Sequence, residues 1–476
     1  MFGMIILALV VLFLAVILVR AAMFKPVDSA IQDNDEVKFD KERAIENLQR
    51  LVRCKTVSRY NHEEEDDAEF DKLTNMLLEL YPNVFKTCEL IDIDKRVRLF
   101  KWKGKNAGEP AVFMAHYDVV PVEEKNWHEE PFSAVIKDGV MWGRGTLDTK
   151  ITFNGVLFAA ETLISEGFMP ENDIYMAFSG GEEVNGPGAK LCVKWFKEQG
   201  ITPAFVIDEG GAVVENVFPG VSQKAALIGL AEKGLMNVTY TCESSGGHAS
   251  SPKPHTPVGL LSLACSRLEA HPFKMKLSMP VRKMFDTLGR YSSFGYKIIF
   301  ANMWCFSWIL DLLGKKSGGN MNALMRTTNA FTMMQGSSAP NVIPPHATMV
   351  SNIRVNPEEN VQFVLDYLKK TINDDSIKIE TTIADEPSRV STMDCEGWNK
   401  VSRAAASTWK CIVSPYLMTQ CSDSRAYGEI SDRVFRFSAM DVSMDEIGTI
   451  HGDNERVRLD TVERSCEFFI RLERMC

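Results

Sequence analysis

Four short polar segments, each placed after an apolar run or inside a glycine-rich turn, constrain the fold of this chain most strongly. They lie at residues 114–121, 143–148, 179–183 and 206–209. In an open α/β sheet, ligands and catalytic groups gather at the carboxyl ends of the strands, where such segments would sit. Strand-like runs alternate with helical patterns in the same region. This alternation predicts an α/β domain with a mostly parallel sheet sandwiched by helices.

The side chains in these segments suit a divalent metal. They include one histidine and several carboxylates but no cysteine, a set that favours a hard-to-borderline ion. Taken singly, a His-x-Asp pair is usually a hydrogen-bonding pair, and adjacent glutamates are usually a solvated face. Their ordered succession, with a further histidine near the C-terminus, predicts a metallohydrolase.

The same order of motifs resembles the di-zinc peptidase family of glutamate carboxypeptidase, aminoacylase and carboxypeptidase S. The resemblance runs from about residue 39 to the C-terminus. It is strengthened by the stretches 326–330, 341–345, 352–354 and 422–425, which are similar to the carboxypeptidase S and N-acyl-amino-acid hydrolase branch.

The resemblance implies a site for two Zn²⁺ ions, which Co²⁺ or Mn²⁺ could replace in vitro. Asp148 would bridge the two ions. His116 and Asp208 would bind one ion, and Glu183 and His451 the other.

Two further residues would serve catalysis. Glu182 would take a proton from the attacking water and later hand it to the leaving amine. The alternative is that Glu182 binds metal and Glu183 is structural. Asp118 would accept the second ring N–H of His116, because residues i and i+2 of an extended chain share a face. The alternative for Asp118 is a capping role.

Four residues match family positions that bind substrate. His248 matches a lid histidine that reaches the active site of the dimer partner and stabilises the oxyanion. Asn341 and Arg354 match a lid pair that grips the substrate carboxylate, a task suited to guanidinium. Arg425 is a second carboxylate-binding candidate, although arginines often make fixed salt bridges instead. The histidines without motif support, which we expect to be structural, are His255, His271 and His346.

The chain departs from the family pattern at two places. Thr149 follows Asp148 where relatives in this branch usually carry a second aspartate. Ser179-Gly180-Gly181 precedes the glutamate pair where they often show Gly-His-Asp. Neither change removes a metal ligand, so we expect effects on loop geometry and substrate preference rather than loss of activity.

The first 19 residues carry no charged side chain and are almost long enough to cross a bilayer. A membrane anchor is favoured over a cleaved signal peptide because the basic segment that starts a signal is missing. Arg20 and Lys25 follow the apolar run, which predicts a cytoplasmic catalytic domain, and the eleven scattered cysteines agree with this. Relatives in this branch, however, work in a lumen or outside the cell. The membrane face stays open, and cleavage would give a secreted protein.

A length of 476 residues suggests two or three domains. We expect an anchor or signal at 1–23, a linker at 24–38, a catalytic domain at 39–228 and 386–476, and an inserted smaller α+β lid domain at 229–385. In the family this lid also mediates dimerisation, which implies a homodimer. The net charge of −10 argues against a nucleic-acid partner.

An aromatic-rich segment lies at residues 285–313. It could form the core of an enlarged lid, an apolar channel for a lipid-like acyl group, or a membrane-facing patch.

The expected activity is cleavage of an amide bond next to a free carboxylate. A carboxypeptidase acting on short peptides is the first expectation, and an N-acyl-amino-acid hydrolase the second. A binding protein without activity on the same scaffold is the third, which the intact set of candidate ligands argues against.

Overall fold

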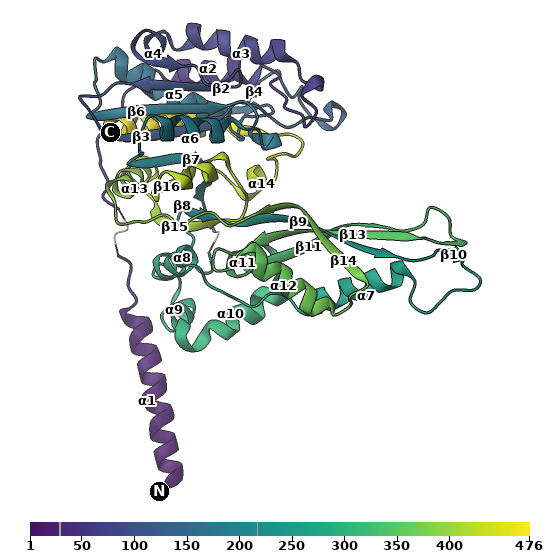
Figure 1. The fold of residues 1–476 in the computed structure, drawn as a ribbon. Helices are drawn as coiled ribbons and strands as arrows, with labels where there is room; N and C mark the ends of the chain where they lie inside the picture. Colours follow the sequence, from purple (N-terminus) through teal and green to yellow (C-terminus); the bar gives the residue numbers. More distant parts are fainter. Residues whose placement is uncertain (28–29, 217) are drawn as a thin grey trace.

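The computed structural model describes residues 1–27, 30–216 and 218–476 (Figure 1). An α/β domain forms the body of the molecule, and the inserted segment extends from it as a long arm. The N-terminal helix α1 (Phe2–Met23) projects away from both.

The body is built on one eight-stranded sheet. Pairing is parallel from β6 through β3 and β7 to β16, and again between β8 and β15, whereas β1, β2 and β6 pair in antiparallel fashion. This confirms the predicted mostly parallel sheet. In spatial order the strands are β1 (Glu89–Ile91), β2 (Val97–Trp102), β6 (Asn172–Ser179), β3 (Asn106–His116), β7 (Phe205–Val214), β16 (Val434–Asp441), β8 (Ala225–Glu232) and β15 (Ile412–Met418).

Helices cover both faces of this sheet, as the side chains of β6 illustrate. Ile174, Met176 and Phe178 belong to the core under one helical layer, and Tyr175 and Ala177 to the core on the other face. This alternation follows from the two-residue period of a strand. The first layer contains α2 (Lys41–Val52), α3 (Asp67–Leu80), α4 (Pro82–Thr87), α5 (Lys150–Ser165), α13 (Glu396–Trp409) and α15 (Leu459–Arg474), and the second α6 (Gly188–Glu198).

The arm is a four-stranded antiparallel sheet in the order β11 (Thr328–Gln335), β13 (His346–Val355), β9 (Gly234–Glu243), β14 (Ile377–Asp385). Helices α7 (Pro257–Ala270) and α12 (Val361–Ile372) pack on one face of it. A two-stranded ribbon, β10 (Gly247–His248) and β12 (Val342–Ile343), forms its tip (Figure 1). Because β8 ends at Glu232 in the main sheet, the chain enters the arm at Lys233, slightly later than the expected residue 229.

Four helices connect the arm to the body: α8 (Met279–Gly289), α9 (Phe294–Phe300), α10 (Met303–Ser317) and α11 (Gly319–Met325). Phe285 and Phe300 pack on Phe218, with ring centroids 5.6 and 4.7 Å away. They share a core with strands β8 and β15 rather than with the sheet of the arm. The aromatic segment therefore does not fill the core of the lid, which α7 and α12 supply.

Two smaller parts complete the body. A three-stranded sheet contains β4 (Val135–Lys137), β5 (Val140–Trp142) and β17 (Arg456–Arg458), and α14 (Met444–Ile447) precedes His451. The segment expected to be a linker has neither helix nor strand in its described part. It lies against α13 and α15, where Asp33 pairs with Arg403 at 2.7 Å and Asp35 with Arg471 at 3.1 Å.

Candidate metal centre

The predicted site residues converge where the parallel strands β3 and β6 end, beside neighbouring β7, which continues past Asp208 to Val214 instead of ending there as expected. His116 is the last residue of β3, Glu182 and Glu183 follow β6 in a short 3-10 turn, and Asp208 lies in β7. Asp148 stands just before α5. His451 reaches the same place from the loop after α14, where its backbone has a φ of 58°.

Asp148 lies between the two histidines. Its Oδ1 atom is 3.2 Å from Nε2 of His116, and its Oδ2 atom is 2.9 Å from Nε2 of His451. The same nitrogen of His451 lies 3.0 Å from Oε2 of Glu183. Each oxygen of the Asp148 carboxylate thus faces a different imidazole, which is the arrangement that a bridging ligand needs.

Glu209 joins this cluster, which sequence reasoning did not predict. Its Oε2 atom is 3.4 Å from Nε2 of His116, and ligand atoms of His116, Glu182 and Glu209 all lie within 4.8 Å of one another. The carboxylate of its neighbour Asp208 is buried and accepts a hydrogen bond from the backbone N–H of Ser424 at 3.0 Å. The only sequence signal for Glu209 was its place beside Asp208 in the fourth polar segment.

Asp118 holds the glutamate turn as well as the histidine. Its carboxylate accepts the backbone N–H groups of Glu182 and Glu183 at 3.1 and 3.2 Å and the hydroxyl of Ser58 at 2.7 Å. Nδ1 of His116 is 3.0 Å from the main-chain carbonyl of Asp118 and 3.5 Å from its carboxylate. The ring is therefore oriented first by the carbonyl, whereas the sequence had suggested the carboxylate.

A buried ion pair joins the two loops that carry Asp148 and His451, and this too was not predicted. Arg144 donates to Glu455 at 2.7 Å and to the carbonyl of Gly452 at 2.8 Å. Glu455 in turn accepts the backbone N–H groups of Leu147 and Asp148 at 2.8 and 3.2 Å. Arg144 lies in the glycine-rich turn and Glu455 only four residues after His451.

The electrostatics of the cluster fit a bound cation. Burial raises the pKa of Glu182 well above its usual range and that of Glu209 to about 8. Burial alone would lower the pKa of His116, but the charge of Glu209 and hydrogen bonds to Asp118 and Asp148 raise it well above its usual value. Oε1 of Glu183 is buried without a hydrogen-bond partner. A divalent cation would stabilise these carboxylates as anions and give that oxygen a partner.

The four residues predicted to bind substrate fall into two groups. Arg354 and Arg425 both approach Cys421, with guanidinium nitrogens 3.2 and 3.1 Å from its sulfur atom. Arg425 also donates to the carbonyl of Lys233 at 2.8 Å. In contrast, His248 and Asn341 lie at the tip of the arm, where the backbone N–H of Ala249 donates to the carbonyl of Asn341 (Figure 1). They are not brought to the metal cluster of their own chain.

A cavity of about 440 Å³ opens beside the cluster. Asp148, Glu182, Glu183 and Glu209 form its acidic side together with the imidazole of His451, and Cys421 connects it to the two arginines. Its remaining wall is largely apolar and is formed by residues that include Leu147, Val214, Leu227, Tyr416, Met418, Met440, Met444, Ile447 and Ile450.

Comparisons with known proteins agree with this geometry. Residues 112–474 match the model of peptidase family M20/M25/M40. The chain is 34% identical to "N-fatty-acyl-amino acid synthase/hydrolase PM20D1" of Xenopus tropicalis, over 91% of this chain and 86% of that protein. It is 33% identical to "Probable carboxypeptidase S-like 2" of Dictyostelium discoideum, over 90% of this chain and 84% of that protein.

Solved structures show the same fold. An M20 family metallo-carboxypeptidase, Sso-CP2 from Sulfolobus solfataricus, superposes with a TM-score of 0.68 at 17% identity and covers 91% of this chain and 98% of its own. Human carnosine dipeptidase 1 gives a TM-score of 0.63 at 14% identity, with 91% and 96% covered. The family expected from the motifs is thereby confirmed: this chain belongs to peptidase family M20/M25/M40 and is a metallohydrolase.

Proposed function

We propose that this chain hydrolyses an amide bond whose carbonyl side is apolar and whose amine side carries a free α-carboxylate. The observation that carries the proposal is the cavity itself, which has the acidic cluster on one side and an apolar wall on another. Arg354 and Arg425 lie behind Cys421, one of the residues that line it. The arginines would bind the carboxylate, and the apolar wall would bind the acyl group.

Two Zn²⁺ ions are the proposed cofactors: Glu183 and His451 would hold one ion, and Asp148 would be shared by both. His116 would hold the other ion together with a carboxylate of β7. Asp208 is the ligand implied by the motif, and Glu209 is the carboxylate whose oxygen lies near His116. When bound, the metal supplies a more acidic water and polarises the scissile carbonyl.

Glu182 is the proposed general base. It lies within reach of the cluster, its backbone is held by Asp118, and it makes none of the ion pairs that occupy Glu183. Glu182 would take the proton of the attacking water and deliver it to the nitrogen of the leaving amine.

Two substrate classes fit the site. N-acyl amino acids are favoured by the apolar wall, since methionine side chains adapt to flexible chains. Short peptides are supported by the similarity to a carboxypeptidase S-like protein.

A panel of substrates separates these classes. We expect kcat/KM to rise along a series of N-acyl amino acids of increasing chain length, because each CH₂ buried in the cavity contributes up to about 0.8 kcal/mol. A series that is flat or falls, with faster cleavage of dipeptides, would instead establish the peptidase activity.

Membrane anchoring by α1 and a lid-mediated homodimer complete the proposal. Helix α1 has a mean hydropathy of 3.3 and is 6% buried, properties that an uncleaved anchor shares with a signal sequence. We propose the anchor and leave the membrane face open. The remote position of His248 supports a dimer in which one subunit completes the site of the other.

A further inference from the structure

Helices α9 and α10 expose large apolar side chains that the proposed hydrolase activity does not use. Trp304 and Trp308 are 61% and 63% exposed, and Phe294 and Tyr296 of α9 are 51% and 44% exposed. Trp304 and Trp308 are four residues apart, so they lie on one face of α10. One turn later the ion pair between Asp311 and Lys315, at 2.9 Å, occupies this side of the helix. Leu312 and Leu313 are also exposed, at 59% and 53%, so the apolar surface runs from α9 along α10 and passes beside this ion pair.

This surface is attached to α1 by specific contacts. Asn302, between α9 and α10, is fully buried and donates to the carbonyl of Ile17 at 3.1 Å. Arg20 donates to the carbonyl of Ala301 at 2.9 Å and to the amide oxygen of Asn302 at 3.0 Å. The ring of Trp304 packs edge-on against that of Phe13, with 6.0 Å between centroids.

These contacts fix the depth of the surface relative to α1. The 22 residues of α1 span about 33 Å at 1.5 Å per residue, close to the thickness of the hydrocarbon core. Phe13 lies ten residues before Met23, about 15 Å from the end at which α1 meets the body. A side chain that touches Phe13 cannot remain in bulk water while α1 crosses a bilayer.

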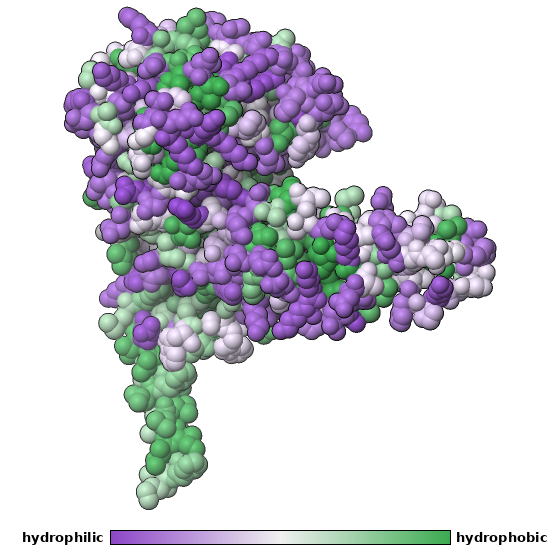
Figure 2. Space-filling view, viewed as in Figure 1, coloured by the Kyte–Doolittle hydropathy of each residue, from purple (hydrophilic) through white to green (hydrophobic). Residues whose placement is uncertain are grey.

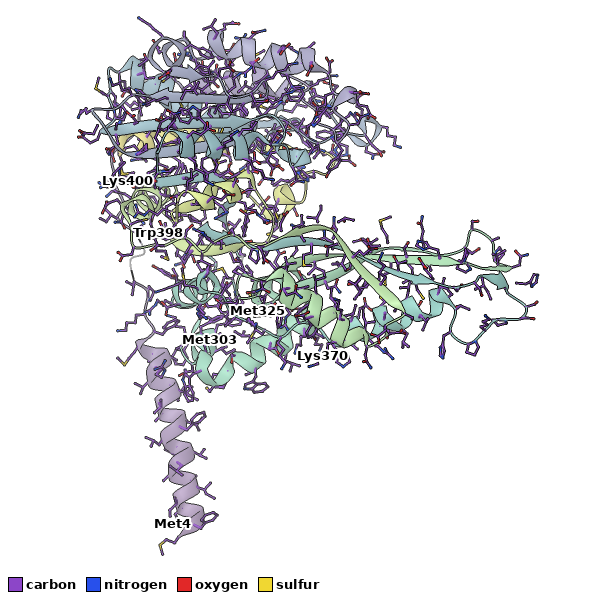
Figure 3. The ribbon with its side chains drawn as sticks, viewed as in Figure 1. Met4, Met303, Met325, Lys370, Trp398 and Lys400 are labelled. Carbon is purple, nitrogen blue, oxygen red and sulfur yellow. The ribbon has the colours of Figure 1, made fainter. Side chains whose placement is uncertain are left out.

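The views of the whole molecule agree. Met303, at the start of α10, lies beside the upper end of α1, whereas Met4 marks its far end (Figure 3). In Figure 2, green and pale surface continues from α1 onto the adjoining underside of the body, whereas most of the remaining visible surface is hydrophilic.

We propose that α9 and α10 form a second membrane contact, which is inserted into the leaflet where α1 joins the body. The inference rests on the proposed anchoring by α1. Tryptophan and tyrosine favour the outer part of a leaflet, near the headgroups, and Trp304 reaches further in, to Phe13. Helices α9 and α10 bend by 106° at their junction, so they would lie in the leaflet instead of crossing it. A bilayer is favoured over a second copy of the chain because the surface is continuous with α1, whose own side chains are mostly exposed.

Quenching of tryptophan fluorescence by brominated lipids tests this contact. The full chain is reconstituted in phosphatidylcholine vesicles with brominated acyl chains, and in unbrominated vesicles. We expect bromine to remove up to about a quarter of the emission, because two of the eight tryptophans would contact lipid. The double variant Trp304→Phe/Trp308→Phe should lose this quenching. The control variant Trp195→Phe, whose substitution lies in α6 of the body, should lose the same amount of emission to bromine as the wild type.

Vesicle flotation after alkaline washing separates the two proposals. A chain that does not float with the vesicles refutes the anchor. A chain that floats but whose emission bromine does not change, or whose double variant is quenched as strongly as the wild type, refutes the membrane contact of α9 and α10 alone. If Trp304 of one chain crosslinks to a second chain in the unbrominated vesicles, the exposed surface of α9 and α10 is a dimer interface instead.

Discussion

Glu182 and Glu183 are neighbours in the sequence but have different partners in the structure. Glu183 pairs with His451, which in turn pairs with Asp148. The carboxylate of Glu182 forms no ion pair among the described residues, and its backbone is held by Asp118 and by the N–H of Asn185. Glu183, which pairs with another candidate ligand, is therefore the better metal ligand. The carboxylate of Glu182 is better placed to move a proton.

This difference predicts the effect of a single substitution. Glu182→Gln should keep the metal content of the wild type but reduce kcat by about 10²–10⁴-fold, because the amide cannot accept a proton. Elemental analysis and steady-state kinetics on the same preparations provide the check, with Glu183→Gln as the matched comparison. Loss of metal from Glu182→Gln together with full metal in Glu183→Gln would reverse the two roles.

Sequence motifs identified most residues of this cluster but could not show which side chains face one another. His116, Asp148, Glu183 and His451 come together as the resemblance implied. The motifs could not decide whether Asp208 or Glu209 faces the cluster. Consecutive residues of a strand point to opposite faces, so a shift of one residue in register exchanges which of the two faces it. Likewise, the pair Arg144 and Glu455 joins loops far apart in the chain, and neither residue has a local pattern that reveals its partner.

Among the larger elements, strands β3 and β6 and the start of β7 were predictable from their apolar runs, whereas the continuation of β7 through Asp208 and Glu209 to Val214 was not. Helices α6 and α12 each bury one face, as apolar periodicity predicts, whereas α5 is buried on nearly all sides. Strands β8, β15 and β16 carry equally buried residues, but the order β7, β16, β8, β15 depends on pairing between distant segments. Helices α8 to α11 were not predicted to leave the lid because their partners, β15 and α1, lie far from them in sequence.

Strand β16 is tied to its helical layer by one buried carboxylate at its end. Asp441 accepts hydrogen bonds from Lys224 at 2.9 Å and from the indole N–H of Trp409 at 3.2 Å. Burial alone would raise the pKa of Asp441, but the hydrogen bond and charge of Lys224 lower it below the ordinary value. Its ionised form therefore stabilises the fold above the unfolded pKa of about 3.9, and this contribution is lost as the pH falls below that value.

Asp441→Asn should consequently reduce the free energy of unfolding by about 2 kcal/mol at pH 7, because hydrogen bonds to a charged group are lost. The difference in free energy of unfolding between variant and wild type should narrow as the pH falls below about 4, toward the lowered pKa at which Asp441 of the folded protein becomes protonated. Urea titrations at several pH values measure both effects. Glu215→Gln is the control, since Glu215 is exposed and 3.8 Å from the same lysine, and it should change stability by less than about 0.5 kcal/mol. If the difference in free energy of unfolding between Asp441→Asn and the wild type does not depend on pH, the ionised carboxylate of Asp441 does not stabilise the fold as described.

The arrangement of body and arm raises the question of what His248 does. It lies in β10 at the tip of the arm, it is exposed, and its Nδ1 atom contacts the hydroxyl of Ser250 at 2.7 Å. The metal cluster lies on the main sheet of the body, whereas β10 forms the far end of the arm (Figure 1). If His248 serves catalysis, it does so in the site of another subunit.

Mixing two inactive variants tests this arrangement. His248→Ala and Glu182→Gln should each be nearly inactive, whereas their equal mixture should recover about a quarter of the wild-type activity, because half of the dimers are hybrids and each hybrid has one complete site. His255→Ala, another exposed histidine of the arm, should keep full activity by itself and serves as the control. Activity is measured after subunit exchange has been verified with tagged chains. Hybrids that form but remain inactive would show that His248 does not act across a dimer, whereas recovered activity would show that each active site is built from two chains.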